Sequence, residues 1–96
     1  GYRLRFQVRG TSMRPLLHHD DEVFVDPRKK TARGDTVVLR HPYRTDVILI
    51  KYVASINESG AVYVLGTNLA ESTDSRGFGW VSPHLIYGCV RSRFRP

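Results

Sequence analysis

The chain has little of what marks disulfide-rich, metal-binding or membrane-spanning proteins. Its 96 residues include one cysteine, Cys89, so no disulfide can form within the chain and no zinc site with several cysteine ligands can be built. A single thiol is compatible with a reducing compartment. No apolar stretch approaches the ~20 residues that a membrane-spanning helix needs. The overall composition, 41% hydrophobic and 25% charged, is ordinary for a globular protein.

Helical periodicity is also nearly absent. Short runs rich in β-branched residues, separated by turn residues, predict an all-β fold, either a coiled sheet or a partly open barrel. At this length we expect residues 1–96 to form a single domain. The expected strands are Leu4–Arg9, Glu22–Val25, Thr36–Arg40, Val47–Ile56, Ala61–Leu65 and Leu85–Phe94. We expect one helical turn within Met13–His18, a hairpin turn at residues 57–60 and a loop from Ser72 to Gly79.

Basic residues outnumber acidic ones, 15 to 9, which gives a formal charge of +6. Such an excess can attract nucleic acid, an anionic membrane surface or an acidic protein. A solvated basic surface is the simpler interpretation, and we expect no nucleic-acid partner. The polar run His18-His19-Asp20-Asp21-Glu22 is interpreted as a loop without a metal site, because side chains of adjacent residues on a strand point to opposite faces.

One lysine lies where a charge is unexpected. Lys51 sits in an apolar run, and no other Asp, Glu, Lys, Arg or His occurs between Asp46 and Glu58. Burial in such a strand penalises a charged amine. A lysine there either marks a sheet edge and reaches the surface, or is kept neutral as a base. A buried lysine can act as a base at neutral pH when its pKa falls from ~10.4 toward ~7–8.

A serine upstream could be the partner of this lysine. Ser12 lies in Gly10-Thr11-Ser12-Met13-Arg14-Pro15, where a turn or a helix cap is the common role of a serine. A serine hydroxyl becomes a nucleophile only when a base takes its proton. Gly10 would let the backbone approach a scissile carbonyl closely, since it carries no side chain. Ser12 and Lys51 are therefore the candidate catalytic dyad.

Four segments together resemble the signal peptidase family of serine–lysine proteases. They are Gly10–Pro15, Gly34–Val38, Ile50–Val53, and Gly66–Asn68 followed by Ser72–Gly79, in the order that the family shows. Within that family the chain is most similar to the proteases that mature nickel-type superoxide dismutase. Two departures are Thr67, where the family usually has an aspartate, and Tyr52, where it usually has a basic residue.

The resemblance implies a role for each matching residue. Ser12 would be the nucleophile and Lys51 the general base, with oxyanion stabilisation from the backbone N–H groups of Ser12 and Gly10. Ser72 would orient the lysine amine, while Asp74 and Arg76 would support the loop as an ion pair. From residue type alone, such a pair is a surface salt bridge of little worth.

The resemblance also implies a serine endopeptidase that needs no cofactor and removes an N-terminal segment from a protein precursor, the nickel superoxide dismutase precursor. A maturation protease of this kind would be cytoplasmic. A general signal peptidase would instead be held at a membrane by an anchor before Gly1, and an anionic membrane surface is a further expected partner. Two alternatives remain: a self-cleaving repressor-type domain, although the chain has neither Ala-Gly nor Cys-Gly, and a non-enzymatic basic β-barrel that binds nucleic acid or anionic lipid.

Overall fold

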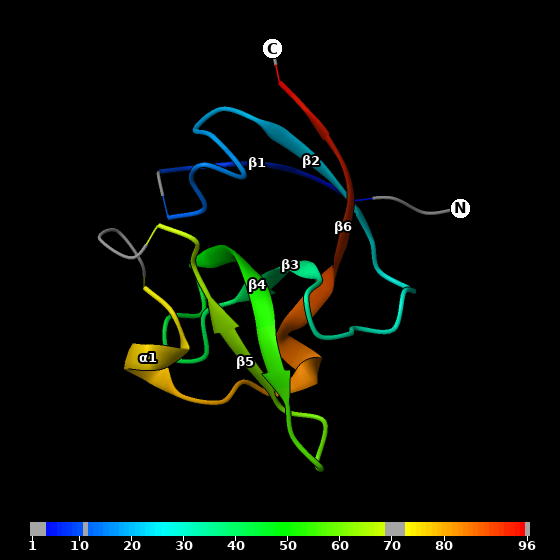
Figure 1. The fold of residues 1–96 in the computed structure, drawn as a ribbon, viewed down its shortest axis with the longest axis vertical. Coiled ribbons are helices and arrows are strands. Elements are labelled where there is room, and N and C mark those ends of the chain that lie inside the picture. The colour runs from blue at the N-terminus through cyan, green and yellow to red at the C-terminus, as the bar shows by residue number, and fades with distance from the viewer. Residues whose placement is uncertain (1–3, 11, 69–72, 96) are drawn as a thin grey trace.

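The protein folds into one open antiparallel sheet of six strands, in the order β1-β2-β6-β3-β4-β5 (Figure 1). This computed structural model describes residues 4–10, 12–68 and 73–95. The elements are β1 (Leu4–Gln7), β2 (Glu22–Asp26), β3 (Thr36–Arg40), β4 (Ile48–Ile56), β5 (Val62–Leu65), α1 (Ser75–Phe78), the 3-10 helix η2 (Pro83–Leu85) and β6 (Ile86–Phe94). The all-β prediction is thus confirmed, and each predicted strand is present with its ends shifted by at most two residues.

The expected loop over residues 72–79 is wrong in part, because α1 forms within its described portion. Asp74 caps this helix by accepting a hydrogen bond from the Arg76 N–H, and Gly79 follows its last residue with φ 81°. A four-residue helix is too short to leave a periodic pattern in the sequence. Neither this helix nor any other in the described part of the chain is long and apolar enough to cross a membrane.

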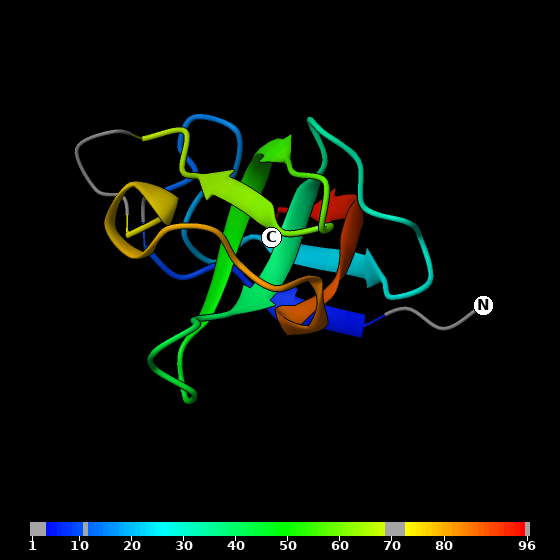
Figure 2. The same cartoon turned by 90° about the horizontal axis from the view of Figure 1, so that it is seen from below.

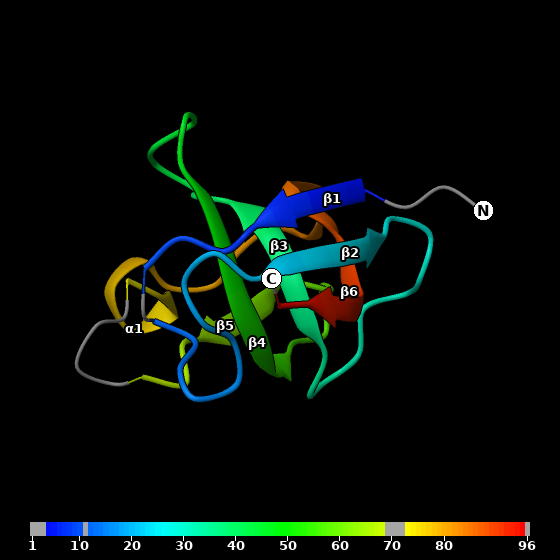
Figure 3. The same ribbon diagram turned by 90° about the horizontal axis from the view of Figure 1, so that it is seen from above.

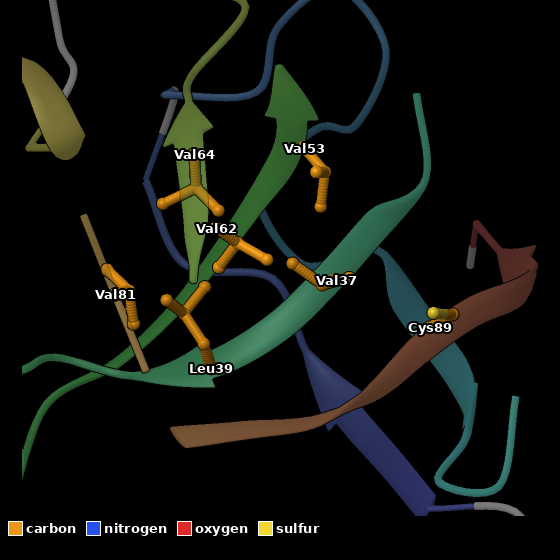
Figure 4. Packing of buried hydrophobic residues seen from close by; sticks show 7 residues of the cluster. All are labelled: Val37, Leu39, Val53, Val62, Val64, Val81 and Cys89. Atoms are coloured by element: carbon orange, nitrogen blue, oxygen red, sulfur yellow. The ribbon is translucent and has the colours of Figure 1, made fainter. Parts of the chain in front are cut away.

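Apolar side chains pack on both faces of the β3–β4 hairpin. The first cluster contains the buried residues Val37, Leu39, Val53, Val62, Val64, Val81 and Cys89. Figure 4 shows most of its side chains gathered between β3, β4 and β5, with Cys89 on β6 to one side. The second cluster contains Val8, Met13, Leu17, Val23, Val25 and Val38. Both faces of β4 are therefore covered, which explains why its sequence is almost continuously apolar.

The sheet leaves one half of β4 without a neighbour on one side. Residues Ile48 to Tyr52 pair with β3, whereas the partners on β5 begin only at Tyr52. Among the described residues, the β5-side edge of Ile48–Lys51 therefore has no strand next to it. β1 is itself a sheet edge, and the chain that follows it crosses over β4 in the view from above (Figure 3). Figure 2 shows the sheet from the opposite side, with β3 and β4 lying side by side.

Candidate active site

Lys51 is the largest fully buried side chain of the described protein and is 1% exposed. It lies in the middle of β4, opposite Val37 of β3, on the face that carries the first apolar cluster. Burial lowers the pKa of Lys51, and the nearby positive charge of Arg76 lowers it further, while Asp74 acts in the opposite direction. The position therefore favours the neutral amine, which is the form that can accept a proton.

Ser12 lies on a loop that joins β1 to β2, here called the Ser12 loop (residues 9–19). Two buried side chains, Met13 and Leu17, anchor this loop in the second apolar cluster. The Leu17 N–H donates to the Met13 carbonyl at 2.8 Å and closes a turn. This turn is not helical, because its Arg14–Pro15 peptide bond is cis, so the helical turn expected over Met13–His18 is wrong. Ser12 itself is half-buried, so its side chain is fixed on a packed loop yet still borders open space.

The Ser12 loop is held from its other side by residues 67 and 68. The Asn68 N–H donates to the Ser12 carbonyl at 2.8 Å. The Thr67 hydroxyl donates to the Arg14 carbonyl, also at 2.8 Å. Thr67 stood out in the sequence only as the loss of an acidic group, whereas in the structure its hydroxyl ties the candidate nucleophile segment to the end of β5. Nothing in a single sequence marks this contact, because the two residues are 53 positions apart.

Ser12 and Lys51 line the same pocket, which has a volume of about 330 Å³. One wall is formed by the end of β1 and the start of the Ser12 loop: Phe6, Gln7, Val8, Arg9, Ser12 and Met13. The other wall is formed by the first half of β4 and by Asp46 in the loop before it: Asp46, Ile48, Leu49, Ile50 and Lys51. Most of these side chains are apolar. The pocket coincides with the stretch of β4 that has no neighbouring strand among the described residues.

The buried Asp74 carboxylate pairs beside this site with Arg76, whose side chain is 41% exposed. Asp74 is 2% exposed, and its carboxylate accepts hydrogen bonds at 3.0 Å from the Arg76 side chain and from the Gly66 N–H. Burial by itself would raise the pKa of Asp74, but the hydrogen bonds from Arg76 and Gly66 outweigh it and lower the pKa from 3.8 to about 2. The pair fastens α1 to the end of β5 and keeps a negative charge near Lys51.

The two remaining predicted site residues are Gly10 and Ser72. Gly10 has φ 79°, and its N–H donates to the Nδ1 atom of His19 at 2.9 Å. That N–H could stabilise an oxyanion only by giving up this bond. Ser72, predicted to orient the lysine amine, lies outside the described residues. Sequence reasoning assigned His19 to a polar loop, and its contact with Gly10 had no signal in the sequence.

Comparison with known proteins identifies the family. A protein-family model described as Peptidase S24-like matches residues 4–73, a range that includes Ser12, Lys51 and all the residues lining their pocket. The chain belongs to the peptidase S24-like family. Membership supports a peptidase function, in agreement with the sequence resemblance at that level. A comparison with curated protein sequences gave no match.

Proposed function

We propose that this S24-like protein is a serine endopeptidase in which Ser12 and Lys51 form the catalytic dyad. The observation that carries the proposal is the burial of Lys51. A lysine that is 1% exposed, and whose pKa is lowered by that burial, lines the same pocket as a serine on a packed loop. A purely structural role would be served better by an apolar side chain, because burying an amine costs free energy.

The proposed reaction proceeds through an acyl-enzyme. The neutral Lys51 amine takes the proton of the Ser12 hydroxyl while the serine oxygen attacks the peptide carbonyl. The resulting ammonium then gives this proton to the leaving amine, and the peptide bond breaks. Water, deprotonated by Lys51, hydrolyses the ester and restores Ser12. Apart from the water consumed, these steps use side chains of the protein.

An extended substrate segment fits the open edge beside the dyad. The backbone of Ile48–Lys51 has no neighbouring strand on its β5 side among the described residues, and β1 presents a second edge across the pocket. A peptide that enters as a strand can form backbone hydrogen bonds with such an edge, while its side chains enter apolar pockets. The apolar wall formed by Phe6, Val8, Ile48 and Ile50 favours apolar substrate side chains next to the cleaved bond.

For the substrate we propose a protein precursor from which an N-terminal propeptide is removed, namely the nickel superoxide dismutase precursor. This narrower assignment is supported by the sequence resemblance to maturation proteases. In such a reaction the nickel belongs to the processed substrate, and the enzyme would be cytoplasmic. A general signal peptidase acting at an anionic membrane would use the same dyad on secretory preproteins.

Mass spectrometry of cleavage products tests the proposal. The protein is incubated with the nickel superoxide dismutase precursor and, separately, with a secretory preprotein, beside the Ser12→Ala and Lys51→Ala variants. We expect one defined N-terminal cut in the dismutase precursor, absent with both variants although circular dichroism shows that they are folded. Arg9→Ala is the control variant. It alters the pocket wall but not the dyad, so it should still cleave the precursor.

Each other outcome assigns a different function. Cleavage of the preprotein alone would keep the dyad and move the function to signal-peptide removal. Cleavage of the protein's own chain, with no precursor present, would indicate a self-cleaving domain. Cleavage that persists in Ser12→Ala would refute the dyad. Absence of any cleavage, with nucleic acid or anionic vesicles bound in a salt-sensitive manner that Ser12→Ala does not change, would support the non-enzymatic barrel.

A further inference from the structure

The base of the Ser12 loop is closed by three hydrogen bonds. Two join backbone groups: the Val8 N–H donates to the Asp21 carbonyl at 2.7 Å, and the Asp20 N–H donates to the Val8 carbonyl at 2.9 Å. The third depends on a side chain, since the Gly10 N–H donates to Nδ1 of His19 at 2.9 Å. This third bond is the one closest to Ser12, two residues before it in the sequence.

The surroundings of His19 determine which ring nitrogen carries the proton. Nδ1 accepts from Gly10, so the neutral ring must carry its proton on Nε2. Nε2 lies 3.3 Å from Oδ1 of Asp20, which can accept that proton in a hydrogen bond. Asp20 has φ 72°, a left-handed conformation that aspartate tolerates better than most residues. The same Oδ1 atom also accepts from the Gln7 side chain of β1 at 3.4 Å.

The polar contacts at His19 and its neighbours involve Asp20, Asp21 and Gln7. Asp20 is the carboxylate in contact with His19. The next residue, Asp21, is engaged by the Arg95 guanidinium and by the His18 N–H. From β1, Gln7 contributes a neutral amide.

We propose that His19 is a positioning residue for Ser12. The neutral ring holds Gly10 in its left-handed conformation and so sets where Ser12 stands relative to Lys51. The inference rests on the proposed function of the dyad, because it states how the nucleophile of that dyad is aligned. Displacing a nucleophile by about 1 Å can cost ~10²-fold in rate, so one hydrogen bond at this point has a large effect.

Substitutions at residue 19 separate positioning from simple packing. His19→Phe keeps a ring but removes the acceptor, and we expect kcat to fall roughly ten- to a hundredfold with KM changed less than about threefold. His19→Asn supplies an amide oxygen near the place of Nδ1, which accepts at every pH. It should restore kcat to within about threefold of wild type. The matched control is His84→Phe, since His84 is exposed on η2.

The split between kcat and KM gives a readout that a purely structural role would not move. The assay uses whichever of the two precursors is cleaved. The inference is overturned if His19→Phe keeps wild-type kcat, or if His19→Asn is as slow as His19→Phe.

Nuclear magnetic resonance reads the same hydrogen bond without any substrate. In ¹⁵N-labelled Ser12→Ala protein near pH 8, a scalar coupling should connect the Gly10 amide nitrogen with Nδ1 of His19. It should disappear in a His19→Phe background. A missing coupling at pH 8 would overturn the positioning role. Retained cleavage by Ser12→Ala would instead overturn the proposed dyad, so the two failures can be told apart.

Discussion

Replacing Lys51 with methionine should abolish activity and yet stabilise the protein. The Lys51 side chain is 1% exposed and lies against apolar residues, and burial lowers its pKa. The folded protein therefore bears a free-energy cost, either for a charged amine out of water or for its deprotonation. Methionine has a similar length without a charge. The Asp74 carboxylate would not be left unpaired by the change, because Arg76 and Gly66 still bind it.

The expected gain in the free energy of unfolding at pH 7 is about 1–3 kcal/mol, within the range seen when buried charges are replaced by apolar groups. For a domain of this size each kcal/mol shifts Tm by roughly 4–8 °C. The gain should depend on pH. Between the lowered pKa of folded Lys51 and the value of 10.5 for an unperturbed lysine, the unfolded chain binds a proton that the folded protein does not. Wild-type stability therefore rises with pH in this window, and the advantage of the variant shrinks.

Urea unfolding at a series of pH values from 7 to 10.5 measures this difference. Lys29→Met is the matched control, because the Lys29 amine binds Asp35 at 2.7 Å and this hydrogen bond raises the pKa of Lys29. The sign is then opposite: the folded protein binds the proton more tightly, so Lys29 contributes stability below pH 10.5 and the variant should be destabilised. The reasoning is refuted if Lys51→Met lowers stability at pH 7, or if its advantage does not change with pH.

Three further predictions concern the supports of the site. Asp74→Asn should cost about 2 kcal/mol at pH 7, and the loss should vanish as pH falls from 4 toward 2, where wild-type Asp74 is protonated, as acid titration of unfolding would show. Thr67→Val should slow cleavage roughly threefold to tenfold with the fold intact, since it removes one bond to the Ser12 loop worth about 1 kcal/mol; Thr67→Ser should be near wild type. Gly88→Ala should lower Tm, because its Cβ would lie 2.6 Å from the Asp26 carbonyl oxygen; an unchanged Tm would contradict the close packing of β2 and β6.

The strands were predictable because their evidence is local. β-branched runs ending at glycine or proline show where a strand begins and ends, and period-two alternation placed Leu49 and Val53 on the face of Lys51, as the clusters confirm. The hairpin turn was equally local: Gly60 has φ 85°, and Asn57 accepts hydrogen bonds from Ser59 and Ala61.

The surroundings of the candidate site were not predictable in the same way. The sequence near Lys51 offers no carboxylate, but folding places Asp74 close enough to affect its pKa. The worth of the Asp74–Arg76 pair depends on burial, which residue types alone do not reveal. The contact of Thr67 with Arg14 links residues 53 positions apart, and that of Gly10 with His19 depends on the conformation of the Ser12 loop. Family resemblance pointed to the dyad and to the Asp74–Arg76 pair, whereas the contacts of Thr67 and His19 required coordinates.

The hydrogen bond from Asn68 to Ser12 affects the time at which activity can appear. The proposed nucleophile lies near the beginning of the chain, but residues 67 and 68 hold its loop, and the Asp74–Arg76 pair beside Lys51 is built later still. During synthesis, a ribosome-bound chain would carry both Ser12 and Lys51 long before these restraints exist. The nascent protein would therefore be inactive toward neighbouring nascent chains until its last third has emerged from the ribosome and folded.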